Sequence, residues 1–142
     1  MSMDFFTAME VSASGLGAER TRMNVAASNL ANAQTTRSAG GGPYKRRDVV
    51  MQSVAAPGAT GSNAAAVHAV QVSQITQDAS PPRLEYDPGH PDANAQGYVA
   101  YPNVNPVEEM VDMITASRAY EAGVTALSTS VNMAEKALSI GR

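Results

Sequence analysis

Residues 9–30 read MEVSASGLGAERTRMNVAASNL and carry large apolar side chains at a seven-residue interval. This interval separates Met9, Leu16, Met23 and Leu30. A second line runs three positions earlier, with one charged interruption, through Phe6, Ala13, Arg20 and Ala27. Two lines with a heptad period are typical of a helix that packs along another helix. The sequence predicts a helix from about Asp4, whose carboxylate can cap the first amides, to about Ala33.

The C-terminal part of the chain has a looser pattern of the same kind. Its first line runs through Met110, Ser117, Val124, Val131 and Leu138, and its second through Met113, Tyr120, Leu127 and Ala134. Asn105 is a suitable N-cap, Pro106 suits the first helical position, and Glu108 stands where it can close a capping box. These signals predict a second helix from Pro106 to about Ile140, ended by Gly141.

All eight prolines lie at positions 43 to 106, so seven lie between the two helical patterns and Pro106 begins the second. Strand-forming residues occur at 44–54, 67–75, 83–86 and 98–101. Low-complexity Ala, Gly, Ser and Asn fill 55–66, which predicts an exposed, flexible loop. The expected fold is therefore mainly α with a small β-rich insert. Its parts are a core helix over 1–36, an insert over 37–104 and a core helix over 105–142, the two helices packing as a coiled-coil-like core.

Large side chains are scarce, since the chain has two Phe, five Tyr and no Trp. A lone monomer is therefore expected to be marginally stable, and its glycine-containing first helix needs packing to be ordered. The second half of that helix carries three amides, Asn24, Asn29 and Asn32. They can make lateral hydrogen bonds to a neighbouring helix, or they can be solvated near the helix end.

Composition excludes several classes of function. The net charge of −3 provides no basic field for nucleic acid, and no stretch approaches the length of a membrane span. The absence of Cys removes thiol chemistry, and no basic, apolar signal peptide is present at the start. No motif for an enzyme or a cofactor is found.

One cluster of potential metal ligands needs an explanation. Asp87, His90 and Asp92 lie within six residues, so a metal-dependent hydrolase is one alternative function. Their spacing matches no metal-binding pattern, and the intervening Pro and Gly residues indicate a turn. We therefore expect no metal site here.

Two segments, SASGLGAERTRMN at 12–24 and SNLAN at 28–32, resemble the N-terminal motif of flagellar rod and hook proteins, the axial family. Further segments are similar to the proximal-rod members of that family: GPYKRR at 42–47, YDPGHPDA at 86–93, YVAYPNVN at 98–105, and residues 108–113, 117–122 and 137–142. Two positions depart from the pattern. Gly123 stands where such proteins usually carry Asn, and Pro106 where an aliphatic residue is common.

The resemblance implies a structural subunit of the basal-body rod, a hollow drive shaft that transmits torque and encloses the export channel. It implies helical assembly through the terminal helices, with the β-rich insert facing outward. The partners it implies are copies of the chain, rod proteins of the FlgB, FlgF and FlgG types, the rod-base adaptor FliE and the flagellar type III export apparatus. It further implies a rod that crosses the periplasm and export without a cleaved signal peptide, with no nucleic acid and no direct membrane insertion.

Most residues of the heptad lines, together with the three amides, form the expected assembly interface. Its residues are Phe6, Met9, Ala13, Leu16, Met23, Asn24, Asn29, Leu30, Asn32, Met110, Met113, Tyr120, Val124, Leu127, Val131 and Leu138. The pattern does not decide whether these residues pair within one subunit, between subunits, or both. The alternative function is a soluble two-helix coiled-coil adaptor, which would dimerise in the cytoplasm.

Overall fold

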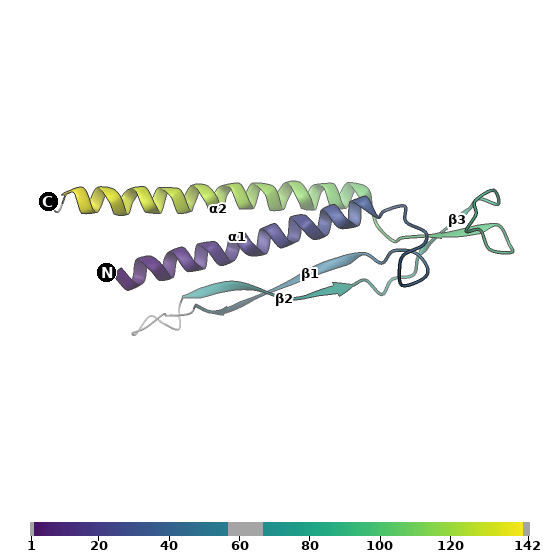
Figure 1. Ribbon diagram of the computed structural model, residues 1–142, viewed down its shortest axis with the longest axis horizontal. Coiled ribbons are helices and arrows are strands. Elements are labelled where there is room, and N and C mark those ends of the chain that lie inside the picture. Colours follow the sequence, from purple (N-terminus) through teal and green to yellow (C-terminus); the bar gives the residue numbers. More distant parts are fainter. Residues whose placement is uncertain (1, 57–66, 141–142) are drawn as a thin grey trace. The chain divides into compact units, whose positions relative to one another are not determined.

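The computed structural model describes residues 2–56 and 67–140. Its elements follow the order α1 (Ser2–Ala31), β1 (Arg47–Ala55), β2 (His68–Gln77), β3 (Arg83–Tyr86), β4 (Tyr98–Tyr101) and α2 (Pro106–Ile140) (Figure 1). Along the sequence, one long helix precedes the four strands and another follows them. The prediction of a mainly α fold with a small β insert is therefore confirmed. The loop expected near 55–66 lies, from residue 57 onward, outside the described residues.

Local hydrogen bonds fix where the helices end. At the start of α2 the Asn105 side chain accepts from the Val107 amide at 3.1 Å, and its carbonyl accepts from the Glu109 amide at 3.1 Å. The predicted N-cap is therefore confirmed, while closure of a capping box by Glu108 stays a prediction. Helix α1 ends at Ala31, two residues before the expected position, because the chain turns through 3.1–3.3 Å bonds from the Ala33 amide to Leu30 and from the Thr35 amide to Asn32.

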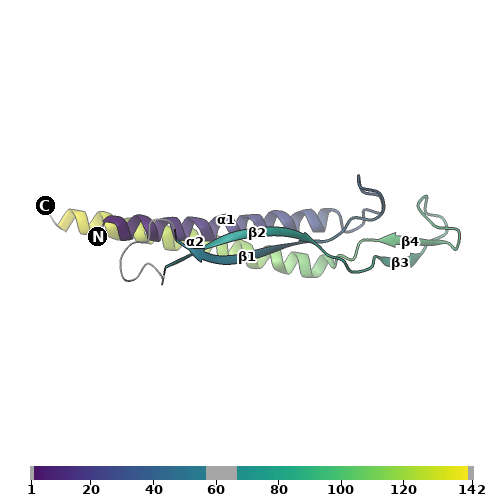
Figure 2. The ribbon, with the colours of Figure 1, turned by 90° about the horizontal axis from the view of Figure 1, so that it is seen from below.

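The strands form two separate two-stranded ribbons, β1–β2 and β3–β4 (Figure 2). In the β3–β4 ribbon the strands are antiparallel, and Tyr86 pairs with Tyr98. Their rings pack edge to face with centroids 5.3 Å apart. Val99 points to the opposite face, as alternation along a strand requires, and is fully buried. Gly97 precedes β4 with a φ of 84°, a conformation that favours glycine.

The chain divides into two compact units. The terminal unit holds residues 1–21, 51–73 and 115–142, and the central unit holds 22–50 and 74–114. Each unit contains part of α1 and part of α2. Among the described residues of the terminal unit, the buried apolar ones are Ala18, Ala56, Ala69 and Ala116. The central unit buries Ala26, Ala33, Tyr44, Val99 and Val104. These small cores agree with the scarcity of large side chains in the sequence.

Two contacts among the described residues join different elements of the terminal unit. Helix α1 meets α2 so closely that a Cβ added at Gly123 would lie 2.7 Å from Leu16 Cδ2. Strand β2 joins α1 through the Val70 amide, which donates to Ser14 Oγ at 3.1 Å. Within the described part of the chain, neither helix is long and apolar enough to cross a membrane.

Candidate assembly interface

One heptad line on each helix is half-buried within the single chain. On α1 this line is Met9, Leu16, Met23 and Leu30, and on α2 it is Met113, Tyr120, Leu127 and Ala134. Leu16 lies against Gly123, which is half-buried between Tyr120 and Leu127 on the same face of α2. The half-buried lines therefore point toward the rest of the chain.

The companion line on each helix is largely exposed. On α1 the exposed line is Phe6, Ala13, Arg20 and Ala27, and Phe6 retains 69% of its accessible surface. On α2 the exposed members are Met110, Val124 and Leu138, whereas Val131 is half-buried. Leu138 is 75% exposed. The residues expected at the interface thus fall into an inward set and an outward set.

Heptad spacing missed part of the outward set. Val107, Val111 and Ile114 are 62%, 57% and 52% exposed, and they adjoin Met110 on the first turns of α2. We call these four residues the α2 stripe. Their spacing of i, i+3, i+4 and i+7 is the ordinary period of one helix face, and a strict seven-residue interval contains only part of it. A contiguous exposed apolar stripe of this kind is typical of a surface that contacts another protein.

The central unit is organised around the buried amide of Asn29, which is 1% exposed. Its Nδ2 donates to the Arg47 carbonyl at 2.8 Å and to Glu109 Oε2 at 2.9 Å. Its Oδ1 accepts from the Arg47 amide and from the Tyr44 hydroxyl, both at 2.9 Å. All four hydrogen-bonding positions of the amide are therefore filled. We call the set Asn29, Tyr44, Arg46, Arg47 and Glu109 the Asn29 clamp.

Glu109 is also 1% exposed and is neutralised inside the clamp. Its Oε1 accepts from Arg46 Nε at 2.6 Å, and Arg46 lies 3.8 Å from the carboxylate of Asp112. Burial acts to lower the pKa of Arg46, but the hydrogen bond and negative charge of Glu109, together with the charges of Asp48 and Asp112, outweigh it and raise that pKa. Arg46 therefore stays protonated throughout the physiological range, and the buried carboxylate keeps its counter-charge.

The three amides of α1 have different surroundings. Asn29 is held within the chain by the clamp, and Asn32 donates to the Ser28 carbonyl at 2.9 Å and accepts from Thr35 Oγ1 at 3.1 Å. Asn24 is exposed. Of the three, only Asn24 presents its amide outward for a contact with a second chain.

The candidate metal ligands serve as turn residues. Asp87 accepts from the Gly89 amide at 3.1 Å, and His90 Nδ1 accepts from the Asp92 amide at 3.1 Å. The Asp92 carboxylate accepts from Thr36 Oγ1 at 2.8 Å and pairs with Arg37 at 2.7 Å. Across residues 2–56 and 67–140, no three His, Asp or Glu side chains gather as a metal site.

Two family models match this chain. Residues 9–37 match the family described as flagella basal body rod protein, and residues 95–140 match flagellar basal body rod FlgEFG protein C-terminal. The chain is 46% identical to the flagellar basal-body rod protein FlgC of Bacillus subtilis (strain 168), over 99% of its own length and 100% of the relative. The FlgC proteins of Borreliella burgdorferi and Salmonella typhimurium are each 42% identical, over 97% and 99% of this chain and 98% and 100% of the relatives. The chain therefore belongs to the FlgC family of flagellar basal-body rod proteins, and it is a structural rod subunit of the flagellar basal body rather than an enzyme or a cytoplasmic adaptor.

Proposed function

We propose that this subunit builds the proximal part of the rod, where copies assemble helically into the hollow shaft that transmits torque and encloses the export channel. The terminal helices over 1–36 and 105–142 form the core of the shaft, and the insert over 37–104 faces outward. The observation that carries this proposal is the split between inward and outward lines on both helices. A chain that used its helices only for its own fold would not leave Phe6, Met110 and Ile114 exposed.

The two sets of residues then have separate tasks. The inward set, with Leu16 against Gly123, holds α1 beside α2 within the subunit. The outward set meets neighbouring rod subunits, which are copies of this chain or other rod proteins of the FlgB, FlgF and FlgG types. Burial stabilises an assembly by about 25 cal/mol per Å² of apolar surface, so each side chain of the α2 stripe contributes on the order of 1 kcal/mol to every contact.

We further infer the subunit's position and its route to the rod. It crosses the inner membrane through the flagellar type III export apparatus without cleavage of a signal peptide, and it assembles in the periplasm next to the adaptor FliE. Helices with alanine cores unfold readily, which suits passage through a narrow channel.

Substitution of Ile114 tests the outward set. The Ile114→Asp variant should keep the helicity of the wild-type monomer, because the side chain is exposed, and should be exported yet missing from purified basal bodies. The Ile114→Val variant is the matched control, since it keeps an apolar side chain, and should assemble normally. Incorporation of Ile114→Asp at the wild-type level would show that the α2 stripe is not part of the interface.

A further inference from the structure

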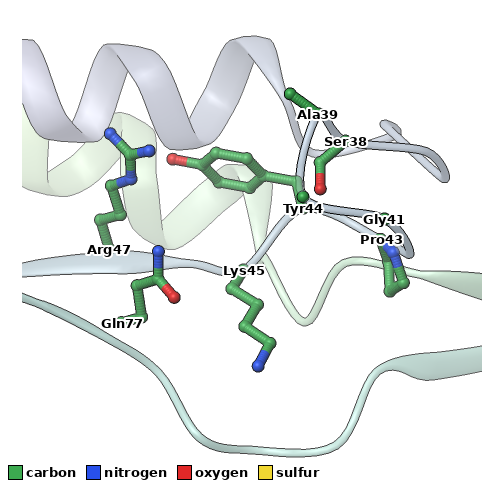
Figure 3. A pocket seen from close by; sticks show the side chains of 9 residues that line it. Ser38, Ala39, Gly41, Pro43, Tyr44, Lys45, Arg47 and Gln77 are labelled. Atoms are coloured by element: carbon green, nitrogen blue, oxygen red, sulfur yellow. The ribbon is translucent and has the colours of Figure 1, made fainter.

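A cavity of about 350 Å³ lies in the central unit, beside the Asn29 clamp (Figure 3). The loop from Ser38 to Pro43 forms one side, Arg47 and Gln77 form the other, and the Tyr44 ring lies between them. The loop is closed by the Ser38 amide, which donates to the Gly42 carbonyl at 2.7 Å. This volume lies at the lower end of the range of about 300–1,000 Å³ that ligand sites occupy.

The cavity carries uncompensated positive charge. Lys45 and Arg47 both line it, and neither makes an ion pair within residues 2–56 and 67–140. None of the residues that line it is acidic. Asp78 lines a neighbouring hollow that Lys45 also lines, and Asp48 lines another that Arg47 also lines, but neither carboxylate lines this cavity. We call this cavity the basic pocket.

The backbone of Arg47 is held in place before any partner arrives, and its guanidinium lies near an aromatic ring. Asn29 binds both the amide and the carbonyl of Arg47, so the backbone at this position is fixed. The guanidinium carbon lies 5.8 Å from the centroid of the Tyr44 ring, and the Tyr44 hydroxyl is itself held by Asn29. A cation on a fixed backbone loses less conformational entropy on binding than a mobile one does.

We propose, resting on the rod function above, that the basic pocket receives an acidic segment of an adjoining rod subunit. A carboxylate can accept two parallel hydrogen bonds from a guanidinium. Such groups are available on neighbouring copies, because each chain carries 13 acidic residues against 10 basic ones. Ala39 and Pro43 supply apolar walls for the methylene groups of an acidic side chain.

A segment of a neighbouring subunit fits this pocket better than a free small anion does. Both cations are exposed, so water screens their attraction for a diffusing ion. A neighbouring subunit covers the pocket as it docks and excludes that water, which strengthens the ion pair. Its carboxylate also arrives at the high effective concentration that a tethered group has.

The test compares two substitutions of Arg47 in cells and in purified basal bodies. Arg47→Glu should leave the helicity and export of the chain unchanged, because Asn29 binds the backbone and not the side chain at this position. Its content in basal bodies should fall by about tenfold or more, because a like charge then faces the incoming carboxylate. Arg47→Lys keeps the charge and should assemble at half the wild-type level or better. If Arg47→Glu lowers helicity, the neutral Arg47→Gln variant is compared with Arg47→Lys in its place.

Further outcomes decide the identity of the ligand. Motile revertants of Arg47→Glu that replace an acidic residue of a rod subunit with a basic one would support the proposal. Normal incorporation of Arg47→Glu into basal bodies would overturn the acidic-segment proposal, and so would an equal loss of incorporation in Arg47→Lys. In either case the presence of the wild-type chain in basal bodies would still support the rod function. Saturable binding of inorganic phosphate to the purified monomer, lost in Arg47→Glu although that variant assembles normally, would overturn it in favour of a small anion. Absence of the wild-type chain from basal bodies would instead refute the rod function.

Discussion

The four hydrogen bonds of Asn29 need a carboxamide, which only asparagine and glutamine carry, and glutamine would displace it by one methylene group. It offers two donors and two acceptors, and the clamp uses all four. A carboxylate lacks the donors, and an apolar side chain lacks both kinds of group. The amide also joins three distant parts of the sequence, since Arg47 lies 18 residues away and Glu109 lies 80 residues away. Stability of the central unit therefore depends strongly on this one residue.

We predict that Asn29→Asp destabilises the central unit by about 3–5 kcal/mol. The new carboxylate would lie beside that of Glu109 and could not donate to the Arg47 carbonyl. Amide hydrogen exchange of the purified chain should then accelerate across residues 22–50. Asn24→Asp, an exposed change on the same helix, is the control and should alter protection little. Equal protection in the two variants would show that the clamp contributes little to stability.

We predict that Gly97→Ala loosens the β3–β4 ribbon while Gly89→Ala does not. At Gly97 the φ of 84° disfavours any side chain, and an added Cβ would lie 2.8 Å from Tyr86 Cε2. At Gly89 an added Cβ would lie 3.6 Å from Asp87 Oδ1, which is an ordinary van der Waals contact. The expected cost at Gly97 is about 1–3 kcal/mol. Hydrogen exchange at the Asp87 amide, which donates to the Gly97 carbonyl at 2.9 Å, reports the difference.

The secondary elements were largely predictable from the sequence, because the signals that set them are local. The cap at Asn105, the proline at 106 and the four strand-forming segments all correspond to observed elements. The clamp was not predictable, because its partners are distant in sequence. An acidic residue in the first turn of a helix ordinarily favours the positive helix end from the surface, yet Glu109 is buried against Arg46, 63 residues earlier. The division into inward and outward lines also required the structure, since both lines share one heptad period.

At the scale of the helix pair, Gly123 and Leu16 should be energetically coupled. Gly123→Ala gains about 1 kcal/mol of helix propensity but forces the Leu16 side chain to move, which costs a similar amount. We predict nearly unchanged stability for Gly123→Ala alone and a gain of about 1 kcal/mol when it is added to Leu16→Ala. Thermal unfolding of the four proteins of this double-mutant cycle measures the coupling. A gain that is the same in both backgrounds would mean that α1 and α2 do not meet there.

At the scale of the molecule, folding and assembly should be separable by mutation. Leu16→Asp and Leu30→Asp place a charge in the inward set, so we predict that they lower the helicity of the monomer and abolish swimming. They differ from Ile114→Asp, which should abolish assembly alone. Circular dichroism of each purified chain and the swimming of each strain distinguish the two classes. Normal swimming of either leucine variant would argue against helix pairing through this line.

Assembly into the rod should slow the amide hydrogen exchange of segments that exchange rapidly in the free monomer. We predict that amide hydrogens of α1 and α2 in the terminal unit exchange rapidly in the monomer, because that unit buries mainly alanine. The same amides should be protected by at least about a hundredfold in isolated basal bodies. Hydrogen exchange followed by mass spectrometry compares the two states. Full protection in the free monomer would mean that assembly does not stabilise the helices further.

At residue 47 the clamp binds the backbone, which stabilises the fold, and leaves the side chain to face the neighbouring subunit. Asn29 recognises the peptide group of Arg47, which every amino acid except proline presents in the same form. Evolution can therefore exchange the side chain at this position while the fold is inherited intact. A lineage could reverse the charge there, acquire the matching change on the neighbouring surface, and so obtain a rod whose parts no longer mix with those of a related flagellar system in the same cell.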